Sequence, residues 1–135
     1  MTDAIGYELL GDIAVLTAQN PPVNALGYDV RTGLWEGIER AEKDGARAVL
    51  IYGDGATFFA GADIKEFGKP PKEPYLPDLC TRIEASPLIV VSSMHGTALG
   101  GGLEIALGSH YRIAAPSARC PRPNRWISTP PMRPC

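Results

Sequence analysis

Met94–Leu107, with the sequence MHGTALGGGLEIAL, is the stretch that decides the fold of this chain. The apolar run Leu88–Val91 before it is rich in β-branched residues and predicts a buried strand. The segment Leu103–Leu107 after the glycines favours a helix. Three glycines therefore join a strand to a helix, and a ligand can touch the backbone there because no Cβ is in the way.

This junction has the chemistry of an anion site. The first turn of a helix presents unpaired N–H groups and a partial positive charge, which suits a phosphate or an oxyanion formed during a reaction. Glu104 falls within that first turn and is a candidate base, although a solvated carboxylate at a helix start is the alternative. Gly100–Gly102 could also form a dinucleotide turn or a packing turn. The dinucleotide fingerprint, however, needs glycine or alanine where Ile105 stands.

Composition and charge narrow the class of protein. The chain has 135 residues, 44% hydrophobic and 21% charged, which is ordinary for one globular domain. Its net charge of −2 gives no basic field for nucleic acid. No apolar run approaches the ~20 residues of a membrane span, and the first residues do not resemble a signal peptide. Three cysteines without a C-x-x-C pair make a disulfide framework or zinc site unexpected and favour a reducing compartment.

Hydrophobic patterns predict alternating strands and helices, and hence an α/β fold. The helix from Asp29 to Asp44 is indicated by Val30, Leu34, Ile38 and Ala41 on one face. The continuous apolar run 48–52 is typical of a strand in a sheet covered on both faces. A second strand-to-helix junction containing glycine is expected at 57–66. The remaining expected elements are strands at 5–10, 13–16, 88–91 and 111–114, and a helix at 79–85.

The last twenty residues differ from the rest. Residues 116–135 hold six of the thirteen prolines, four arginines and no acidic residue. Such a density of proline blocks helices and central strands. We therefore expect a domain over 1–119 and a proline/arginine-rich tail over 120–135 that is disordered or read out of frame.

Three segments in order resemble the enoyl-CoA hydratase/isomerase (crotonase) superfamily. They are Pro22–Leu26 (PVNAL), Phe59–Glu66 (FAGADIKE) and His95–Glu104 (HGTALGGGLE), and the resemblance covers residues 5–119. The segment Ala106–Ala114 is similar to the N-terminal hydratase part of multifunctional fatty-acid β-oxidation enzymes. The resemblance implies the N-terminal half of a crotonase fold built from repeated ββα units.

The resemblance also implies a catalytic site and a substrate. The N–H groups of Ala62 and Gly101 would form an oxyanion hole for an acyl-CoA thioester, and Glu104 would activate water or move a proton. No cofactor is expected, because coenzyme A is part of the substrate thioester, and no metal is expected. Family members self-associate. The residues that would bind substrate or CoA are Asn24, Ala25, Leu26, Ala60, Gly61, Asp63, Ile64 and Gly100.

One part of the family pattern is not matched. Hydratases of this family carry a second glutamate about twenty residues after the first, whereas Arg122–Asn124 contains no carboxylate. We therefore expect an enoyl-CoA hydratase/isomerase of fatty-acid oxidation that is truncated after about residue 119 and has little activity. The alternatives are an inactive acyl-CoA-binding or assembly fragment and a nucleotide-binding module. The expected location is the cytoplasm in a bacterium, or the peroxisome or mitochondrial matrix.

Two further expectations concern single side chains. Asp63 can cap the helix that follows it rather than contact a ligand. His95 and His110 are the only histidines and are expected to be structural rather than metal ligands or bases.

Overall fold

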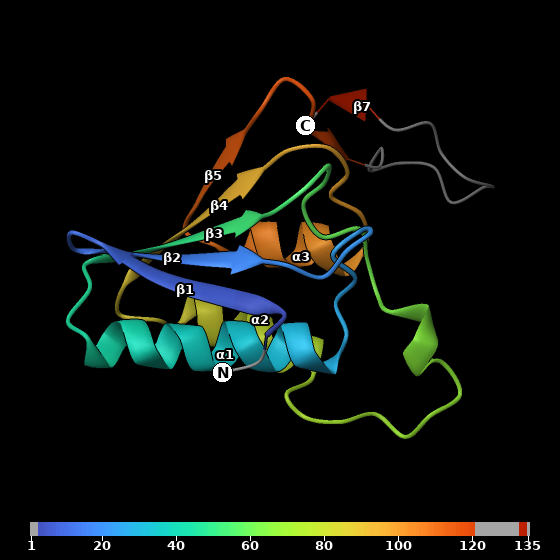
Figure 1. The fold of residues 1–135 in the computed structure, drawn as a ribbon, viewed down its shortest axis with the longest axis horizontal. Coiled ribbons are helices and arrows are strands. Elements are labelled where there is room, and N and C mark those ends of the chain that lie inside the picture. The colour runs from blue at the N-terminus through green and yellow to red at the C-terminus, as the bar shows by residue number, and fades with distance from the viewer. Residues whose placement is uncertain (1–2, 121–132, 135) are drawn as a thin grey trace.

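The computed structural model describes residues 3–120 and 133–134, and its core is a five-stranded sheet (Figure 1). The strand order is β1-β2-β3-β4-β5, with β1 antiparallel to β2 and the other neighbours parallel. Most of the predicted tail, 121–132 and 135, lies outside the described residues. The strands are β1 (Ile5–Leu10), β2 (Ile13–Ala18), β3 (Ala48–Gly53), β4 (Ile89–Met94) and β5 (Tyr111–Ala114). The helices are α1 (Tyr28–Lys43), α2 (Leu76–Glu84), α3 (Gly101–Gly108) and the single 3₁₀ turn η1 (Ile64–Glu66).

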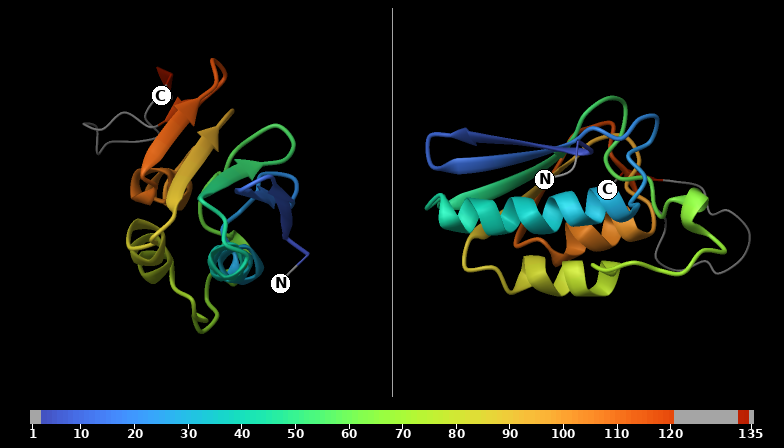
Figure 2. Two further views of the ribbon diagram at one scale, coloured as in Figure 1. Left: turned by 90° about the vertical axis from the view of Figure 1, so that its left-hand side faces the viewer. Right: turned by 60° about the horizontal axis from the view of Figure 1, so that its bottom comes forward.

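The three α-helices of the described residues lie on one face of the sheet (Figure 2). The strand residues that face them, among them Leu16, Ile51 and Val90, are fully buried. On the opposite face Leu50 is only half-buried and Tyr52 is exposed. The expectation of a sheet covered on both faces is therefore wrong for the described residues, because alternate side chains of a strand point to opposite faces and helices cover only one.

Helix α1 confirms the spacing seen in the sequence. Its four predicted apolar residues are fully buried against the sheet. The helix begins at Tyr28, and its N-cap residue, Gly27, has no side chain that could bond to the first turn. The carboxylate of Glu66 accepts the N–H of Tyr28 instead, 2.5 Å away, so a distant residue caps this helix.

The second predicted junction, 57–66, does not contain a strand. Its backbone N–H groups bond to separate loops, Phe58 to the carbonyl of His95 and Ala60 to that of Val23. These acceptors lie in two separate loops and do not form one continuous strand alongside the segment, so it stays irregular while Phe58 and Phe59 are fully buried. Two other predicted elements are shifted, since α2 begins at residue 76 instead of 79 and β4 covers 89–94.

Helix α3 starts where two backbones meet. A Cβ built on Gly102 would lie 1.9 Å from the carbonyl oxygen of Phe59, far inside van der Waals contact. Gly100, just before the helix, has φ +54° and ψ −119°, a conformation that a residue with a Cβ rarely adopts. The close approach therefore explains why glycine is required at this turn.

After α3 the chain forms β5 at one edge of the sheet, and all four of its residues are exposed. The segment then returns beside the glycine turn, where Ala98 N–H bonds to the carbonyl of Arg119. Strand β6 (Arg119–Cys120) pairs antiparallel with β7 (Arg133–Pro134). Cys120 is in a disulfide bond and Cys80 is a free thiol, so a disulfide occurs where the cysteine pattern did not predict one.

We expect Gly102→Ala to lower the free energy of unfolding by about 3 kcal/mol, because a methyl group would force the Phe59 backbone away. Gly108→Ala in the same helix is the control, since its Cβ would lie 3.4 Å from the nearest atom. The control should change stability by less than about 1 kcal/mol. Urea denaturation followed by circular dichroism measures both, and equal stabilities would contradict the steric argument.

Candidate functional site

The two glycine segments predicted from the sequence meet in the structure. A Cβ built on Gly100 would lie 4.0 Å from the Cα of Gly61, and one built on Gly61 would lie 3.5 Å from the carbonyl oxygen of Leu99. Ala62 and Gly101 each follow one of these glycines. Within the described residues, no hydrogen bond uses the N–H of Ala62 or of Gly101. Ala62 and Gly101 therefore lie beside the contact between the two glycine segments, each with a backbone N–H that no other group in the described residues uses.

Leu26 connects the two segments. Its N–H donates to the carbonyl of Gly61 over 2.8 Å. Its side chain is buried and lies 3.0 Å from the position of a Cβ on Gly101. Of the predicted loop residues 24–26, Leu26 therefore contacts both glycine segments, at Gly61 and at Gly101.

Asn24 has a structural task that the sequence did not indicate. It is 2% exposed and has φ +51°, an uncommon conformation that asparagine tolerates better than most residues. Its Nδ2 donates to the carbonyls of Asp54 and Thr57, and its Oδ1 accepts the N–H of Asn20. The side chain therefore joins loops 20–26 and 54–57 through backbone groups. The carbonyl of Ala25 is likewise engaged, by Nδ2 of Asn20.

The residues around Ala62 border a small hollow of about 250 Å³. Ala60 donates its N–H to Val23, so that group is occupied. Asp63 caps η1, because its Oδ1 accepts the N–H of Lys65 over 3.0 Å, which confirms the capping alternative. Ile64 is 75% exposed, beyond the hollow. The side chains that line this hollow include Leu26, Arg31, Asp63, Glu66, Phe67 and Leu76.

Glu104 is exposed and lies in the first turn of α3, as predicted. It is not among the residues that line the hollow beside Ala62. Its charge acts instead on the thiol of Cys80 in α2. Burial first, and then the negative charge of Glu104, raises the pKa of the Cys80 thiol. The Glu104 carboxylate is thus close enough to the Cys80 thiol to interact with it electrostatically.

Both histidines bond to backbone groups. In His110, Nδ1 accepts the N–H of Val90 and Nε2 lies 3.0 Å from the carbonyl of Glu84. In His95, Nε2 lies 2.8 Å from the carbonyl of Gly55, and the ring stacks on Tyr52. These contacts fit the structural role that was expected.

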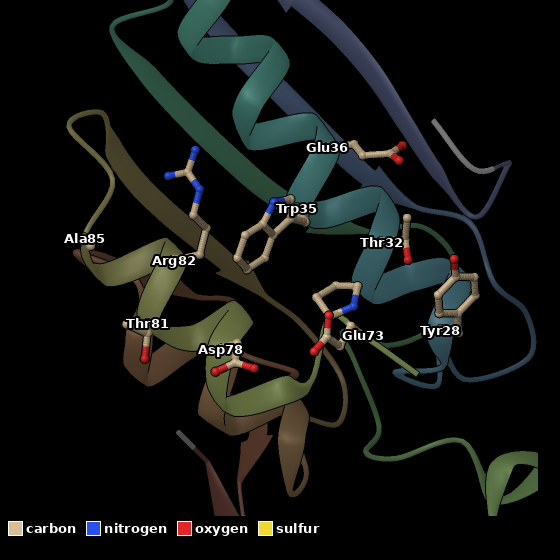
Figure 3. A pocket seen from close by; sticks show the side chains of 10 residues that line it. Tyr28, Thr32, Trp35, Glu36, Glu73, Asp78, Thr81, Arg82 and Ala85 are labelled. Atoms are coloured by element: carbon tan, nitrogen blue, oxygen red, sulfur yellow. The ribbon is translucent and has the colours of Figure 1, made fainter. Parts of the chain in front are cut away.

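A larger hollow of about 690 Å³ lies away from these residues, between α1 and α2 (Figure 3). Trp35 and Arg82 face one another across it, with the guanidinium carbon 5.9 Å from the ring centre. This larger hollow contains none of the predicted site residues.

Among the described residues, no three His, Cys, Asp or Glu side chains gather where they could hold a metal ion. Within residues 3–120 and 133–134, no helix is both long and apolar enough to cross a membrane.

Comparison with known proteins identifies the family and the fold of the chain. A family profile described as Enoyl-CoA hydratase/isomerase matches residues 8–131. The chain belongs to the enoyl-CoA hydratase/isomerase family. This match confirms the resemblance drawn from the motifs, and the family is one of enzymes. The crystal structure of enoyl-CoA hydratase from Thermoplasma volcanium superimposes with a TM-score of 0.79 at 28% identity, covering 89% of this chain and 51% of that one. The α/β crotonase fold is thus confirmed as a partial fold.

Two relatives place the chain within the hydratase/isomerase family. It is 47% identical over 115 residues to a peroxisomal bifunctional enzyme of Danio rerio, covering 84% of this chain and 16% of that protein. It is 44% identical over 115 residues to a probable enoyl-CoA hydratase of Bacillus subtilis, covering 79% of this chain and 45% of that protein. The chain therefore spans less than half the length of these two relatives.

Arg31 and Leu76 contribute to the surroundings of the site but were missed in the sequence. Arg31 follows Val30 in α1, and no neighbouring residue in the sequence indicates that its side chain is buried. In the structure Arg31 is buried, with only 8% of its surface exposed. Leu76 comes before the helix predicted at 79–85, and its Cδ2 lies 2.7 Å from the position of a Cβ on Gly101.

We expect Asn24→Asp to lower the free energy of unfolding by about 3 kcal/mol, because a carboxylate would replace the donor that serves the carbonyls of Asp54 and Thr57. Asn20→Asp is the control, since its Nδ2 donates to one carbonyl only. Chemical denaturation at neutral pH should show a clearly smaller loss for the control. Equal losses would contradict a special role for Asn24.

We expect Glu104→Gln to make Cys80 more reactive. Removing the negative charge lowers the pKa of the thiol and raises its thiolate fraction, so alkylation by iodoacetamide at pH 8 should be faster by roughly twofold. Mass spectrometry of the Cys80 peptide measures the rate. Glu84→Gln, at the end of the same helix as Cys80, serves as the control and should leave the rate unchanged. A Glu104→Gln rate equal to wild type would show that Glu104 does not act on Cys80.

Proposed function

We propose that this chain binds the thioester of an enoyl-CoA, with the carbonyl oxygen between the N–H groups of Ala62 and Gly101. The observation that supports this is the approach of Gly61 to Gly100, which puts two unengaged N–H groups in one neighbourhood. The oxygen of a conjugated thioester gains negative charge when a nucleophile adds at C3. Donors aimed at that oxygen stabilise the transition state more than the substrate, and each is typically worth about 3 kcal/mol.

Glu104 is the proposed base in this arrangement. It follows Gly101 by three residues in α3, and its carboxylate is exposed to water. It would orient or deprotonate the water that adds to C3, or carry a proton in double-bond isomerisation. The geometry of a helix start favours this, since backbone N–H groups and the carboxylate belong to the same turn.

The CoA part would follow the hollow beside Ala62. Asp63 lines this hollow. Ala60, Gly61 and Ile64 neighbour Ala62 and Asp63 in the chain, and Gly100 approaches Gly61. We propose that these residues lie along the path of CoA. We propose no cofactor beyond the CoA of the substrate. The relatives named as peroxisomal and bacterial enzymes favour a role in fatty-acid β-oxidation in one of the corresponding compartments.

A second candidate is an acyl-CoA-binding chain with little turnover. Residues 105–135 contain no Asp or Glu, so Glu104 is the last carboxylate side chain in the sequence. Hydration needs a second group that protonates C2, and acid–base assistance is typically worth 10²–10⁴-fold. We therefore propose that the 135-residue chain hydrates enoyl-CoA at least roughly 10³-fold more slowly than a family member with both carboxylates.

A crotonyl-CoA hydration assay paired with calorimetric titration separates the candidates. We expect binding of crotonyl-CoA, no binding of NAD or ATP, slow hydration, and little further loss in Glu104→Gln. Adding a family-type Gly-Leu-Pro-Glu segment and its following helices after Arg119 should restore turnover and make it depend on Glu104. Turnover equal to a two-carboxylate enzyme would contradict the slow-turnover proposal, and absence of CoA-thioester binding would contradict the proposed function itself.

A further inference from the structure

Arg31, near the start of α1, connects loops that are distant in sequence. Its side chain is 10% exposed, and its guanidinium donates to acceptors in three separate segments. A guanidinium carries five N–H donors in a rigid plane, so one side chain can hold several acceptors at fixed angles. The contacts are Nε to the carbonyl of Pro74 (2.8 Å), Nη1 to the carbonyl of Leu26 (2.8 Å) and to Oε2 of Glu66 (3.0 Å), and Nη2 to the carbonyl of Lys72 (3.2 Å).

One set of contacts leads to Ala62. The segment 61–66 is fixed at both ends. At its start, the carbonyl of Gly61 accepts the N–H of Leu26, whose own carbonyl is held by Arg31. At its end, Glu66 pairs with Arg31 directly. Ala62 lies between these two anchors, so the direction of its N–H depends on both.

A second set leads to Gly101. Two side chains pack against the position of its Cβ, Leu76 at 2.7 Å and Leu26 at 3.0 Å. Leu76 begins α2, two residues after the Pro74 carbonyl that Arg31 holds. Arg31 therefore anchors the backbone at or beside both residues that border Gly101.

We propose that Arg31 is a positioning residue that fixes the spacing between the N–H groups of Ala62 and Gly101. The inference rests on the proposed function for the identity of the ligand. The planar fork is the essential feature, because a lysine in its place would keep the charge but could not hold the carbonyls of Leu26, Lys72 and Pro74 together.

The test compares Arg31→Lys with a matched control, Arg82→Lys. Arg82 also forms an ion pair, with Glu42 at 2.7 Å, but contacts neither glycine segment. Without ligand, the backbone amides of residues 60–76 should exchange hydrogen at least about tenfold faster in Arg31→Lys and at the wild-type rate in Arg82→Lys. With saturating 4-(dimethylamino)cinnamoyl-CoA, whose absorption moves to longer wavelength when its carbonyl is polarised, Arg31→Lys should show a smaller red shift than the wild type.

A further variant keeps the test decisive if Arg31→Lys folds poorly. Glu66→Gln removes the charge of one anchor and leaves the three carbonyl contacts of Arg31 in place. Faster exchange should therefore be confined to residues 60–67 and to Tyr28, whose N–H Glu66 also accepts. Unchanged exchange in the Arg31 and Glu66 variants, or equal acceleration in Arg82→Lys, would overturn the positioning role. A wild-type chain without a red shift would instead contradict the proposed function, and the exchange data would still decide the role of Arg31.

Discussion

The contact between Gly102 and the carbonyl of Phe59 is the constraint on which the rest of the site depends. With 1.9 Å between that oxygen and any Cβ on Gly102, the start of α3 can lie against the 57–63 segment only if no side chain intervenes. Leu99 N–H, bonded to the same carbonyl over 3.3 Å, holds the crossing in place. The approach of Gly61 to Gly100 follows from this crossing, since both glycines are within two residues of it.

The parts of the fold that were predictable are those specified by local pattern. The buried face of α1 follows from a spacing of three and four residues, and the strands follow from short apolar runs. The glycine turn was also predictable, because a glycine cluster between a strand and a helix indicates a place where the backbone turns or is closely approached. The 57–66 segment was predicted incorrectly, since its apolar residues match a strand in composition but its hydrogen-bond partners come from loops far away in sequence.

The parts that could not be predicted depend on long-range contacts between polar groups. Nothing near Arg31 in the sequence indicates that three carbonyls and a carboxylate will surround it. Asn24 matched a family motif, yet only the fold shows that its amide bridges two loops. The proximity of Cys80 to Glu104 likewise depends on the packing of α2 against α3. Hydrophobic periodicity specifies which face is buried, whereas it carries no information on which polar group will meet which.

Strand β5 has a consequence for how this sheet can grow. One side of its backbone bonds to β4, and in the described part of the chain no strand lies along its other side. Tyr111 and Ile113 project from the same face and are 63% and 59% exposed. A row of unpaired N–H and C=O groups next to apolar side chains is a template for another strand. Within β5, no charged side chain shares the face of Tyr111 and Ile113, where it would disfavour such pairing. A further strand could thus pair along β5, with a register that Tyr111 and Ile113 would set.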